Sequence, residues 1–478
     1  MHKLNVQDIA HATSADLLVD SARLVQDVVI DSRKVGDGSL FVCFPGERVD
    51  GNDYAAAAME AGAACVALTR EPTEELIAQA HACDCALLRA AEDDATRFLT
   101  GLAHSWRRMN GAWTVVAVTG SVGKTTTKDM LAAGLATAGK VFATPANLNT
   151  LLGCALTLLS ADETDRFVIC EMGVDGVGDM APLTTMAEPD LAVITNIGTS
   201  HLGNFGTREA IAREKAQVAH GMGRMEGTLA PVLAMPADDD FFALVARDFA
   251  APSGVAMVSV GTGDGCDVRA TSVTLDDESH PTVMVSLADG QGVCATLDVL
   301  GTHVVADYLL ALGVCWKAGI NVRAAAEGIA HMRRTALRME VKTADGRPRV
   351  IDDSYNASPS SMAAALDVLA SMRCEGRRAA VLGEIGELGE DAPRLHGYVG
   401  AYAAAKGLDL VVFVGTDNAR HMIEAARTMG VGEERIESYP SSDAALAALK
   451  DRFTTRDLVL VKGSRFMGLD AFARGVLA

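Results

Sequence analysis

Short apolar runs separated by helix-compatible stretches make up most of the chain beyond about residue 112. Each run is followed by a turn and a helical pattern, which is typical of a parallel sheet with crossover helices. The runs are residues 115–118, 167–170, 191–194, 349–351, 379–382, 410–414 and 458–461. Between residues 227 and 300 the pattern changes to short alternating strands with Asp and Gly turns, which predicts an antiparallel extension.

The chain is longer than a single hydrophobic core usually serves, so we expect three α/β domains. Residues 1–95 are expected to form a mixed α/β domain and residues 96–331 a central domain with the parallel sheet. A helix over residues 303–318, with Gly319 as its C-cap, would close the central domain. Residues 332–478 predict a Rossmann-like domain whose missing G-x-G-x-x-G fingerprint argues against a redox cofactor.

Residues 28–51 predict two strands joined by turns. The first strand leads into Asp31, Ser32 and Arg33, a turn follows at residues 36–38, and a second strand covers residues 40–44. These residues alone favour a plain hairpin, because Ser, Arg and Asp are common beside turns that have no function.

Residues 113–130, WTVVAVTGSVGKTTTKDM, predict an apolar strand, a glycine-containing turn and the start of a helix. The turn would present backbone N–H groups and a helix N-terminus to an anion. Lys124 adds a positive charge, and Thr125 is a possible Mg²⁺ ligand. This order predicts a phosphate site of the short T-G-x-x-G-K-T form.

The strands that begin at residues 115, 167 and 191 all end in polar or glycine residues. Because ligands of open α/β sheets bind beyond the carboxyl ends of the strands, we expect these ends to converge on one site. Glu171 follows the second strand, and hard cations prefer carboxylate oxygens, so we favour a metal role over a helix cap. His201, beyond the third strand, is left open between a site residue and a loop histidine.

Three further charged residues have no settled role from the residues alone. Lys215 lies in a helix-compatible run and is typical of a solvated lysine. Arg338 and Asp353 bracket the start of the last domain, where they could reach phosphate oxygens and a ribose hydroxyl.

Composition excludes several classes of protein. A formal net charge of −20 argues against a nucleic-acid partner, because phosphate backbones are bound by clustered Lys and Arg. No signal-peptide pattern and no apolar run long enough to span a bilayer are found, so we expect a cytoplasmic protein without membrane insertion. The ten cysteines are scattered without paired CxxC motifs, which predicts free thiols.

A series of motifs resembles the Mur ligases of peptidoglycan synthesis. The motifs are TGSVGKTTTKDM, ATPANLNTLLG, EMGVDGVGDM, VITNIGTSHLGNFGTREAIAREKAQ, RMEV with DDSYNASPSSM, VLGEIGELGE and VLVKGSR, and DSRKVGDGSLFVCFPG near the N-terminus. The resemblance covers nearly the whole chain. It implies an N-terminal UDP-binding domain, a central P-loop ATPase domain and a C-terminal Rossmann-like ligase domain. The implied activity is an ATP-dependent amide ligase that adds D-alanyl-D-alanine to UDP-N-acetylmuramoyl-tripeptide through an acyl phosphate.

The resemblance also implies roles for single residues. ATP would be held by Gly120, Ser121, Val122, Gly123, Lys124, Thr125, Thr126, Asp307, Arg338 and Asp353. Thr125 and Glu171 would bind one Mg²⁺ and His201 a second. Lys215 matches a lysine that is carbamylated in the family, which replaces the solvated interpretation with a ligand of the second ion. Substrate contacts would come from Ser32, Arg33, Asp50, Gly51, Asn147, Asn149, Asn356 and Ser358.

Four positions depart from the family pattern. Thr150 and Leu151 follow Asn149 where a second asparagine and an acid are usual, and Asn52 replaces a frequent histidine. Asp307 replaces an asparagine; a carboxylate can accept a hydrogen bond from an adenine amino group but cannot donate one to a ring nitrogen. We therefore expect adenine recognition to differ.

Two alternatives stay open. One is another Mur-type or folylpolyglutamate-type amide ligase, which would share the ATP site and differ in its acceptor. The other is a non-catalytic paralogue that binds nucleotide or cell-wall precursors. A monomer is expected.

Overall fold

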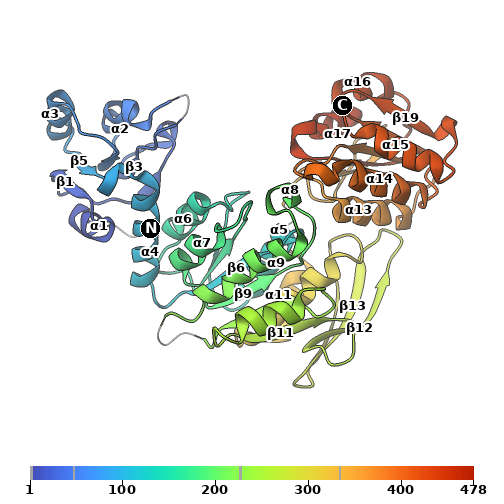
Figure 1. Ribbon diagram of the computed structural model, residues 1–478, viewed down its shortest axis with the longest axis horizontal. Helices are drawn as coiled ribbons and strands as arrows, with labels where there is room; N and C mark the ends of the chain where they lie inside the picture. Colours follow the sequence, from blue (N-terminus) through green and yellow to red (C-terminus); the bar gives the residue numbers. More distant parts are fainter. Residues whose placement is uncertain (1–3, 47–48, 226–228, 333–334) are drawn as a thin grey trace.

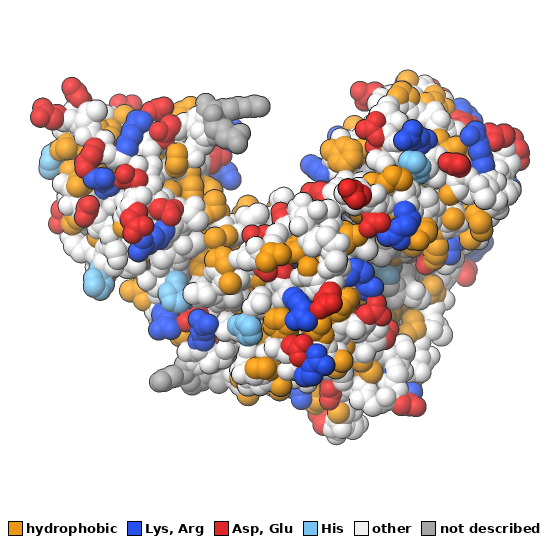
Figure 2. Space-filling view, viewed as in Figure 1, with side chains coloured by type: hydrophobic (Ala, Val, Ile, Leu, Met, Phe, Trp, Pro, Cys, Tyr) orange, Lys and Arg blue, Asp and Glu red, His pale blue; other side chains and the backbone are white. Residues whose placement is uncertain are grey.

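The computed structural model describes residues 4–46, 49–225, 229–332 and 335–478, and it contains three α/β domains, each built on its own sheet. The N-terminal and C-terminal domains stand on either side of the central domain (Figure 1). Figure 2 shows that the surface is deeply hollowed between these two domains, above the central one. The domain boundaries at residues 95 and 331 stay predictions.

The N-terminal domain has a five-stranded sheet in the order β1-β5-β4-β3-β2. Its strands are β1 (Asp16–Val19), β2 (Asp27–Val29), β3 (Ser39–Val42), β4 (Cys65–Leu68) and β5 (Ala86–Arg89), and its helices are α1 (Val6–Thr13), α2 (Ala55–Glu60) and α3 (Glu74–Ala82). The predicted hairpin is wrong, because β2 and β3 are parallel. A 3-10 turn over Ser32–Lys34 follows β2 and starts the connection that returns the chain to the same direction. Helix α4 (Ala95–Met109) leads to the central domain.

The central sheet has nine strands in the order β14-β13-β12-β11-β10-β9-β6-β8-β7. The strands are β6 (Thr114–Thr119), β7 (Val141–Ala143), β8 (Phe167–Glu171), β9 (Leu191–Ile194), β10 (Val232–Pro236), β11 (Ala256–Gly261), β12 (Val268–Leu275), β13 (Pro281–Leu287) and β14 (Gly292–Thr296). Strands β12, β13 and β14 pair antiparallel, which confirms the predicted extension. The prediction is wrong for β10 and β11, because they continue the parallel sheet.

Helices cover both faces of this sheet, and β8 and β9 are buried along their whole length. The helices are α5 (Lys124–Leu135), α6 (Leu151–Ser160), α7 (Met180–Ala187), α8 (Leu202–Phe205), α9 (Arg208–Ala216), α10 (Phe242–Val245), α11 (Val304–Lys317) and α12 (Val322–Ala330). Helix α11 is the predicted closing helix, and Gly319 beyond it has a φ of +74°, as expected of a residue that ends a helix.

The C-terminal domain has a six-stranded sheet in the order β15-β16-β20-β17-β18-β19. Its strands are β15 (Glu340–Lys342), β16 (Arg349–Asp353), β17 (Arg378–Gly383), β18 (Leu410–Val414), β19 (Ile436–Tyr439) and β20 (Leu458–Lys462). The helices are α13 (Pro359–Ser371), α14 (Ala392–Ala404), α15 (Ala419–Thr428), α16 (Ser442–Leu449) and α17 (Leu469–Leu477). The predicted strands are confirmed. The two edge strands β15 and β19 escaped prediction because each is short and partly polar.

Among the contacts that hold the central and C-terminal domains together, some lie at two places away from the glycine turn. The turn between β12 and β13 pairs Glu278 with Arg349, and its Asp277 carbonyl accepts a hydrogen bond from the Arg373 amide at 2.7 Å. At the other place, the Glu387 carbonyl accepts from the Gly203 amide at 3.3 Å. These contacts set the carboxyl ends of the two sheets toward each other. None of the helices in the described ranges has the length and apolar character that crossing a bilayer requires.

Candidate active site

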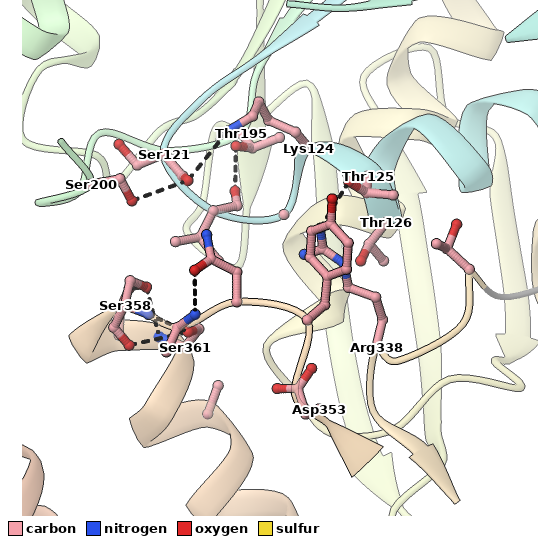
Figure 3. Close-up of a pocket in the computed structure, with 18 of the residues that line it drawn as sticks. Ser121, Lys124, Thr125, Thr126, Thr195, Ser200, Arg338, Asp353, Ser358 and Ser361 are labelled. Atoms are coloured by element: carbon pink, nitrogen blue, oxygen red, sulfur yellow. Dashed lines mark hydrogen bonds between the residues drawn. The ribbon is translucent and has the colours of Figure 1, made fainter. Parts of the chain in front are cut away.

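A cavity of about 840 Å³ lies between the central and C-terminal domains. Figure 3 shows its two walls, with Lys124, Thr125 and Thr126 on one side and Arg338, Asp353 and Ser358 on the other. Most predicted site residues line it: Ser121, Val122, Gly123, Lys124, Thr125, Thr126, Asn147, Asn149, Glu171, His201, Asp307, Arg338, Asp353, Asn356 and Ser358. Gly120 and Lys215 do not line it, and neither do Ser32, Arg33, Asp50 and Gly51 of the N-terminal domain.

The glycine turn has the shape that its sequence predicts. Gly120 and Gly123 have φ of +140° and +89°, and Gly123 is the N-cap of α5. A Cβ at Gly120 would lie 1.9 Å from Thr195 Oγ1, so only glycine fits there. The side chain of Asn196, just beyond β9, donates to the Val122 carbonyl at 2.9 Å and accepts from the Val122 amide at 3.2 Å. These bonds fix the turn in place before any ligand binds.

Lys124 is folded back over this turn. Its Nζ donates to the Gly120 carbonyl at 2.8 Å and lies 3.4 Å from the Ser121 carbonyl. Burial lowers the pKa of the Lys124 ammonium, while the negative charge of Glu171 opposes that shift. An anion in the cavity would favour the charged form of this lysine.

Two oxygen donors meet behind the turn. Thr125 Oγ1 lies 3.1 Å from Oε2 of Glu171, which is buried at the end of β8. The other Glu171 oxygen, Oε1, accepts from Asn149 Nδ2 at 3.0 Å, which orients the carboxylate. A hydroxyl and a carboxylate side by side are the donor set that a hard cation prefers.

His201 bridges the two domains. Its Nε2 lies 3.3 Å from Asp175 Oδ1, and its Nδ1 lies 2.6 Å from Oε2 of Glu387 in the C-terminal domain. Its φ of +58° is uncommon for a residue with a side chain and sets the ring into the cavity. His201 therefore lies in the cavity, and its functional role stays a prediction.

Lys215 lies on α9, behind the cavity wall, and is 1% exposed. Burial, and next the positive charge of Lys124, lower the pKa of its ammonium well below its usual range. The expectation of a solvated lysine from residues alone is therefore wrong. Both effects favour the uncharged amine over the ammonium at this position.

Arg338 reaches the glycine turn from the C-terminal domain. Its Nη2 lies 3.3 Å from Thr125 Oγ1, and its guanidinium carbon lies 4.3 Å from the centre of the Tyr355 ring. Leu337 and Met339 on either side have φ of +62° and +49°, so the backbone is strained at this point. The Met339 amide donates to Asp353 Oδ1 at 3.2 Å, which helps to hold the strained segment.

Asp353 has a strong partner that the sequence did not reveal. Lys462, buried at the end of β20, donates to Asp353 Oδ2 at 2.5 Å and to the Asn356 carbonyl at 3.1 Å. Ser358 caps α13 through its bond from the Ser361 amide at 3.3 Å. These contacts give Asp353, Asn356 and Ser358 fixed positions on the cavity wall.

Asp307 corrects one expectation. Its Oδ1 accepts from Thr127 Oγ1 at 3.0 Å, and a Cβ at Gly123 would lie 2.5 Å from the same oxygen. Burial raises the pKa of this carboxyl to about 7. The prediction that Asp307 cannot donate a hydrogen bond assumed a carboxylate; the neutral acid carries one O–H donor.

The predicted substrate residues of the N-terminal domain form a separate group. Asp50 caps a 3-10 turn, accepts from the Asn52 amide at 2.9 Å and lies 3.1 Å from Arg70 Nη1. A Cβ at Gly51 would lie 2.7 Å from the Phe44 amide nitrogen, so this position requires glycine. Arg33 is largely exposed and pairs with Asp31 at 2.8 Å. That pair holds the pKa of the Asp31 carboxyl at about 2.

Several cavity residues had no role assigned from sequence. They are Asp175, Tyr355, Glu387, Lys462 and Arg465. Lys462 ends a parallel strand, so the rule that points to Glu171 could also have found it. Asp175 and Glu387 carry no such signal, because their relation to His201 depends on how the domains meet. No three His, Cys, Asp or Glu side chains of the described ranges are arranged to hold a metal ion by themselves.

Family models and known proteins that match this chain point to one family, the Mur ligases. The model of the Mur ligase family catalytic domain matches residues 25–95, the Mur ligase middle domain residues 118–315, and the Mur ligase glutamate ligase domain residues 337–465. The UDP-N-acetylmuramoyl-tripeptide–D-alanyl-D-alanine ligase of Mycobacterium bovis is 34% identical over 99% of this chain and 97% of its own length. The ligase of the same name from Bacillus subtilis is 31% identical over 99% and 97%.

Solved structures of MurF ligases resemble this chain over nearly its whole length. A MurF crystal structure from Acinetobacter baumannii has a TM-score of 0.88 and 27% identity, covering 100% of this chain and 99% of the other. The MurF ligase of Thermotoga maritima in complex with ADP has a TM-score of 0.78 and 25% identity, covering 95% and 98%. The chain belongs to the Mur ligase family, in the group of UDP-N-acetylmuramoyl-tripeptide–D-alanyl-D-alanine ligases.

Proposed function

We propose that this protein is an ATP-dependent ligase that joins D-alanyl-D-alanine to the terminal carboxylate of UDP-N-acetylmuramoyl-tripeptide in peptidoglycan precursor synthesis. The observation that carries the proposal is the single cavity in which Arg338 of one domain meets the Thr125 hydroxyl of another. The names of the Mycobacterium bovis and Bacillus subtilis relatives support the choice of substrates.

ATP would bind with its phosphates over the glycine turn. Amide groups at the start of α5 and the ammonium of Lys124 would face the phosphate oxygens. The buried Nε of Arg338 has no hydrogen-bond partner among the described residues and could donate to one of them. The ADP complex of the Thermotoga maritima ligase supports this use of the cavity. Asp353 would meet the ribose and Asp307 the adenine side of the nucleotide.

Two Mg²⁺ ions fit the donors present. Thr125 and Glu171 would hold the first, since their oxygens lie 3.1 Å apart in the cavity wall. His201 would hold the second with a carbamylated Lys215, because burial lowers the pKa of the Lys215 ammonium and favours the amine form, which can attack carbon dioxide to give a carboxylate-like anion. Bound Mg²⁺ would neutralise charge on the phosphates.

The reaction has two steps. An oxygen of the tripeptide carboxylate attacks the γ-phosphorus of ATP, the bond to the ADP oxygen breaks, and an acyl phosphate forms. The uncharged amine of D-alanyl-D-alanine then attacks the acyl carbon, loses a proton, and expels inorganic phosphate through a tetrahedral intermediate. Lys124 and Arg338 would stabilise the charge on the transferring group, so positioning supplies most of the catalysis.

The N-terminal domain would hold the uridine nucleotide through Ser32, Arg33, Asp50 and Gly51, with Asn147, Asn149, Asn356 and Ser358 nearer the reacting end. The hollow between the outer domains, visible in Figure 2, offers a path from that domain to the cavity. Because every substrate is a nucleotide, a nucleotide-linked peptide or a free dipeptide, we place the reaction in the cytoplasm. We expect the enzyme to act as a monomer, which light scattering after gel filtration can check.

The test is a phosphate-release assay with ATP and a panel of UDP-muramoyl peptides, in both the meso-diaminopimelate and the lysine tripeptide forms. Release that requires D-alanyl-D-alanine supports the proposal. Release with another amine would favour a different amide ligase of the same build. Tight ATP binding with no amide product would favour the non-catalytic paralogue. That alternative is motivated by the departures from the family pattern at Thr150, Leu151 and Asp307.

A further inference from the structure

Four cationic side chains line the cavity, and one of them differs from the others. Lys124 is bonded to the glycine turn, Arg338 to Thr125, and Lys462 to Asp353. The guanidinium of the fourth, Arg465, forms no hydrogen bond or ion pair with any residue in the part of the chain that the structure describes, although its backbone carbonyl accepts from the Gly468 amide at 3.3 Å. Asp470 forms an ion pair with Arg474 at 2.8 Å, which lowers the pKa of the Asp470 carboxyl, and the charge of Arg465 makes a smaller contribution to that shift. Arg465 thus presents an unengaged guanidinium at the cavity.

The position of Arg465 is set by Tyr355. The centre of the Tyr355 ring lies 4.3 Å from the guanidinium carbon of Arg338 and 5.7 Å from that of Arg465. One ring therefore separates the arginine that reaches the glycine turn from the arginine that is free. Two extended residues span about 7 Å, so a dipeptide whose amine lies near the transferring phosphoryl group can present its carboxylate beyond Tyr355.

The segment that carries Arg465 is anchored. The Ser464 amide donates to the Glu384 carbonyl at 3.1 Å, and Ser464 Oγ accepts from the Gly386 amide at 3.0 Å. Phe466, next along the chain, lines the same cavity with 66% of its surface exposed. An unengaged guanidinium on an anchored backbone segment, beside an exposed aromatic ring, suits a small ligand that carries a carboxylate and methyl groups.

We propose that Arg465 binds the C-terminal carboxylate of the acceptor dipeptide and that Phe466 packs against its methyl groups. The inference rests on the proposed function and assigns the acceptor side of its site. Lys124 and Arg338 are already assigned to the phosphates, and the uridine-linked substrate is assigned to the N-terminal domain. Arg465 would accordingly act as a specificity residue that recognises the charge at the end of the dipeptide.

The test compares D-alanyl-D-alanine with its C-terminal amide, which has the same shape and no negative charge. In the Arg465→Gln variant the KM for the dipeptide should rise about 10- to 100-fold, as expected for a lost charge-assisted bond. The KM values for ATP and the tripeptide substrate should stay within about twofold. The wild-type preference for the acid over the amide should disappear, and Arg465→Lys should restore part of it. Arg456→Gln, an exposed arginine outside the cavity, is the matched control.

An unchanged preference for the acid in Arg465→Gln would overturn the inference, and so would an increase in KM confined to ATP or to the tripeptide substrate. Saturation-transfer NMR with D-alanyl-D-alanine and ADP measures dipeptide binding without turnover. If the wild type makes no amide but binds the dipeptide, and the variant does not, the proposed function fails while the assignment of Arg465 stands. Equal dipeptide binding by both proteins counts against Arg465.

Discussion

The Nη2 atom of Arg338 lies 3.3 Å from Oγ1 of Thr125, and this contact joins the C-terminal domain to the first turn of α5. Thr125 also touches Glu171, so a guanidinium and a carboxylate share one hydroxyl. Opposite charges at this point can serve a phosphate and its metal ion together. The proposed nucleotide site is thus complete only when both domains are present.

Replacing Arg338 by lysine keeps the charge but removes the planar set of donors and the stacking on Tyr355. We expect kcat/KM for ATP to fall about 10- to 100-fold, because hydrogen bonds to charged groups are worth about 1.5–3 kcal/mol. Steady-state kinetics at saturating acceptor measure the effect. Arg347→Lys, at a position outside the cavity, serves as control, and equal losses in both variants would remove the special role of Arg338.

Glu171→Gln keeps the size of the side chain and its ability to accept from Asn149 Nδ2. It removes the negative charge beside Thr125, so the Mg²⁺ concentration for half-maximal activity should rise about 10-fold or more. Activity measured across a Mg²⁺ titration checks this, with the exposed Glu209→Gln as control. An unaltered Mg²⁺ requirement would show that the first ion binds elsewhere.

Asp307 should make nucleotide binding depend on pH. Its folded-state pKa is raised to about 7 by burial, so the carboxyl is neutral below that pH and becomes negative as pH rises through it. The negative charge would form at the adenine side of the nucleotide but also beside Gly123 of the glycine turn, where it would repel the phosphates and weaken ADP binding by up to about tenfold per pH unit above 7. Asp307→Asn stays neutral throughout.

Calorimetric titration of ADP from pH 6 to 9 measures this dependence, and the ratio of wild-type to Asp307→Asn Kd cancels the titration of ADP itself. The ratio should be flat below pH 6.5 and rise above pH 7, where burial no longer keeps the acid neutral. A ratio that stays constant over the whole range would mean that Asp307 does not change charge near the nucleotide.

Lys215 should carry a carbamate in the active enzyme, because burial lowers the pKa of its ammonium and so favours the nucleophilic amine. Labelling with ¹³C-bicarbonate should give a carbamate signal in the NMR spectrum of the wild type that is absent from Lys215→Ala. The variant should lose about 100-fold or more in kcat, as removal of a metal ligand does. Short-chain carboxylic acids should restore part of the activity. A spectrum without the signal would remove carbamylation from the account.

Many of the strands could be predicted from local patterns of apolar residues in the sequence. The strands at residues 115–118 and 410–414 are continuous apolar runs, and both are buried in the structure. Such a run can be recognised in the sequence without knowing how the chain folds. Strands β2 and β3 show the limit, because a turn rich in Gly and Asp fits a hairpin as well as the short connection between parallel strands seen here.

Some features of the candidate site could be predicted from the sequence, and others could not. Lys124, Thr125 and Glu171 belong to one sheet, and the ends of parallel strands bring them together. The pairing of His201 with Glu387 depends instead on domain contacts, and the raised pKa of Asp307 depends on burial. Neither property is written in the order of the residues.

The central claim is ligation through an acyl phosphate, and oxygen transfer tests it most directly. UDP-N-acetylmuramoyl-tripeptide labelled with ¹⁸O in its terminal carboxylate is incubated with the enzyme, ATP and D-alanyl-D-alanine, and the products are analysed by mass spectrometry. The account predicts the pentapeptide product together with inorganic phosphate that carries a labelled oxygen. Pentapeptide with unlabelled phosphate, or no pentapeptide at all, would contradict it.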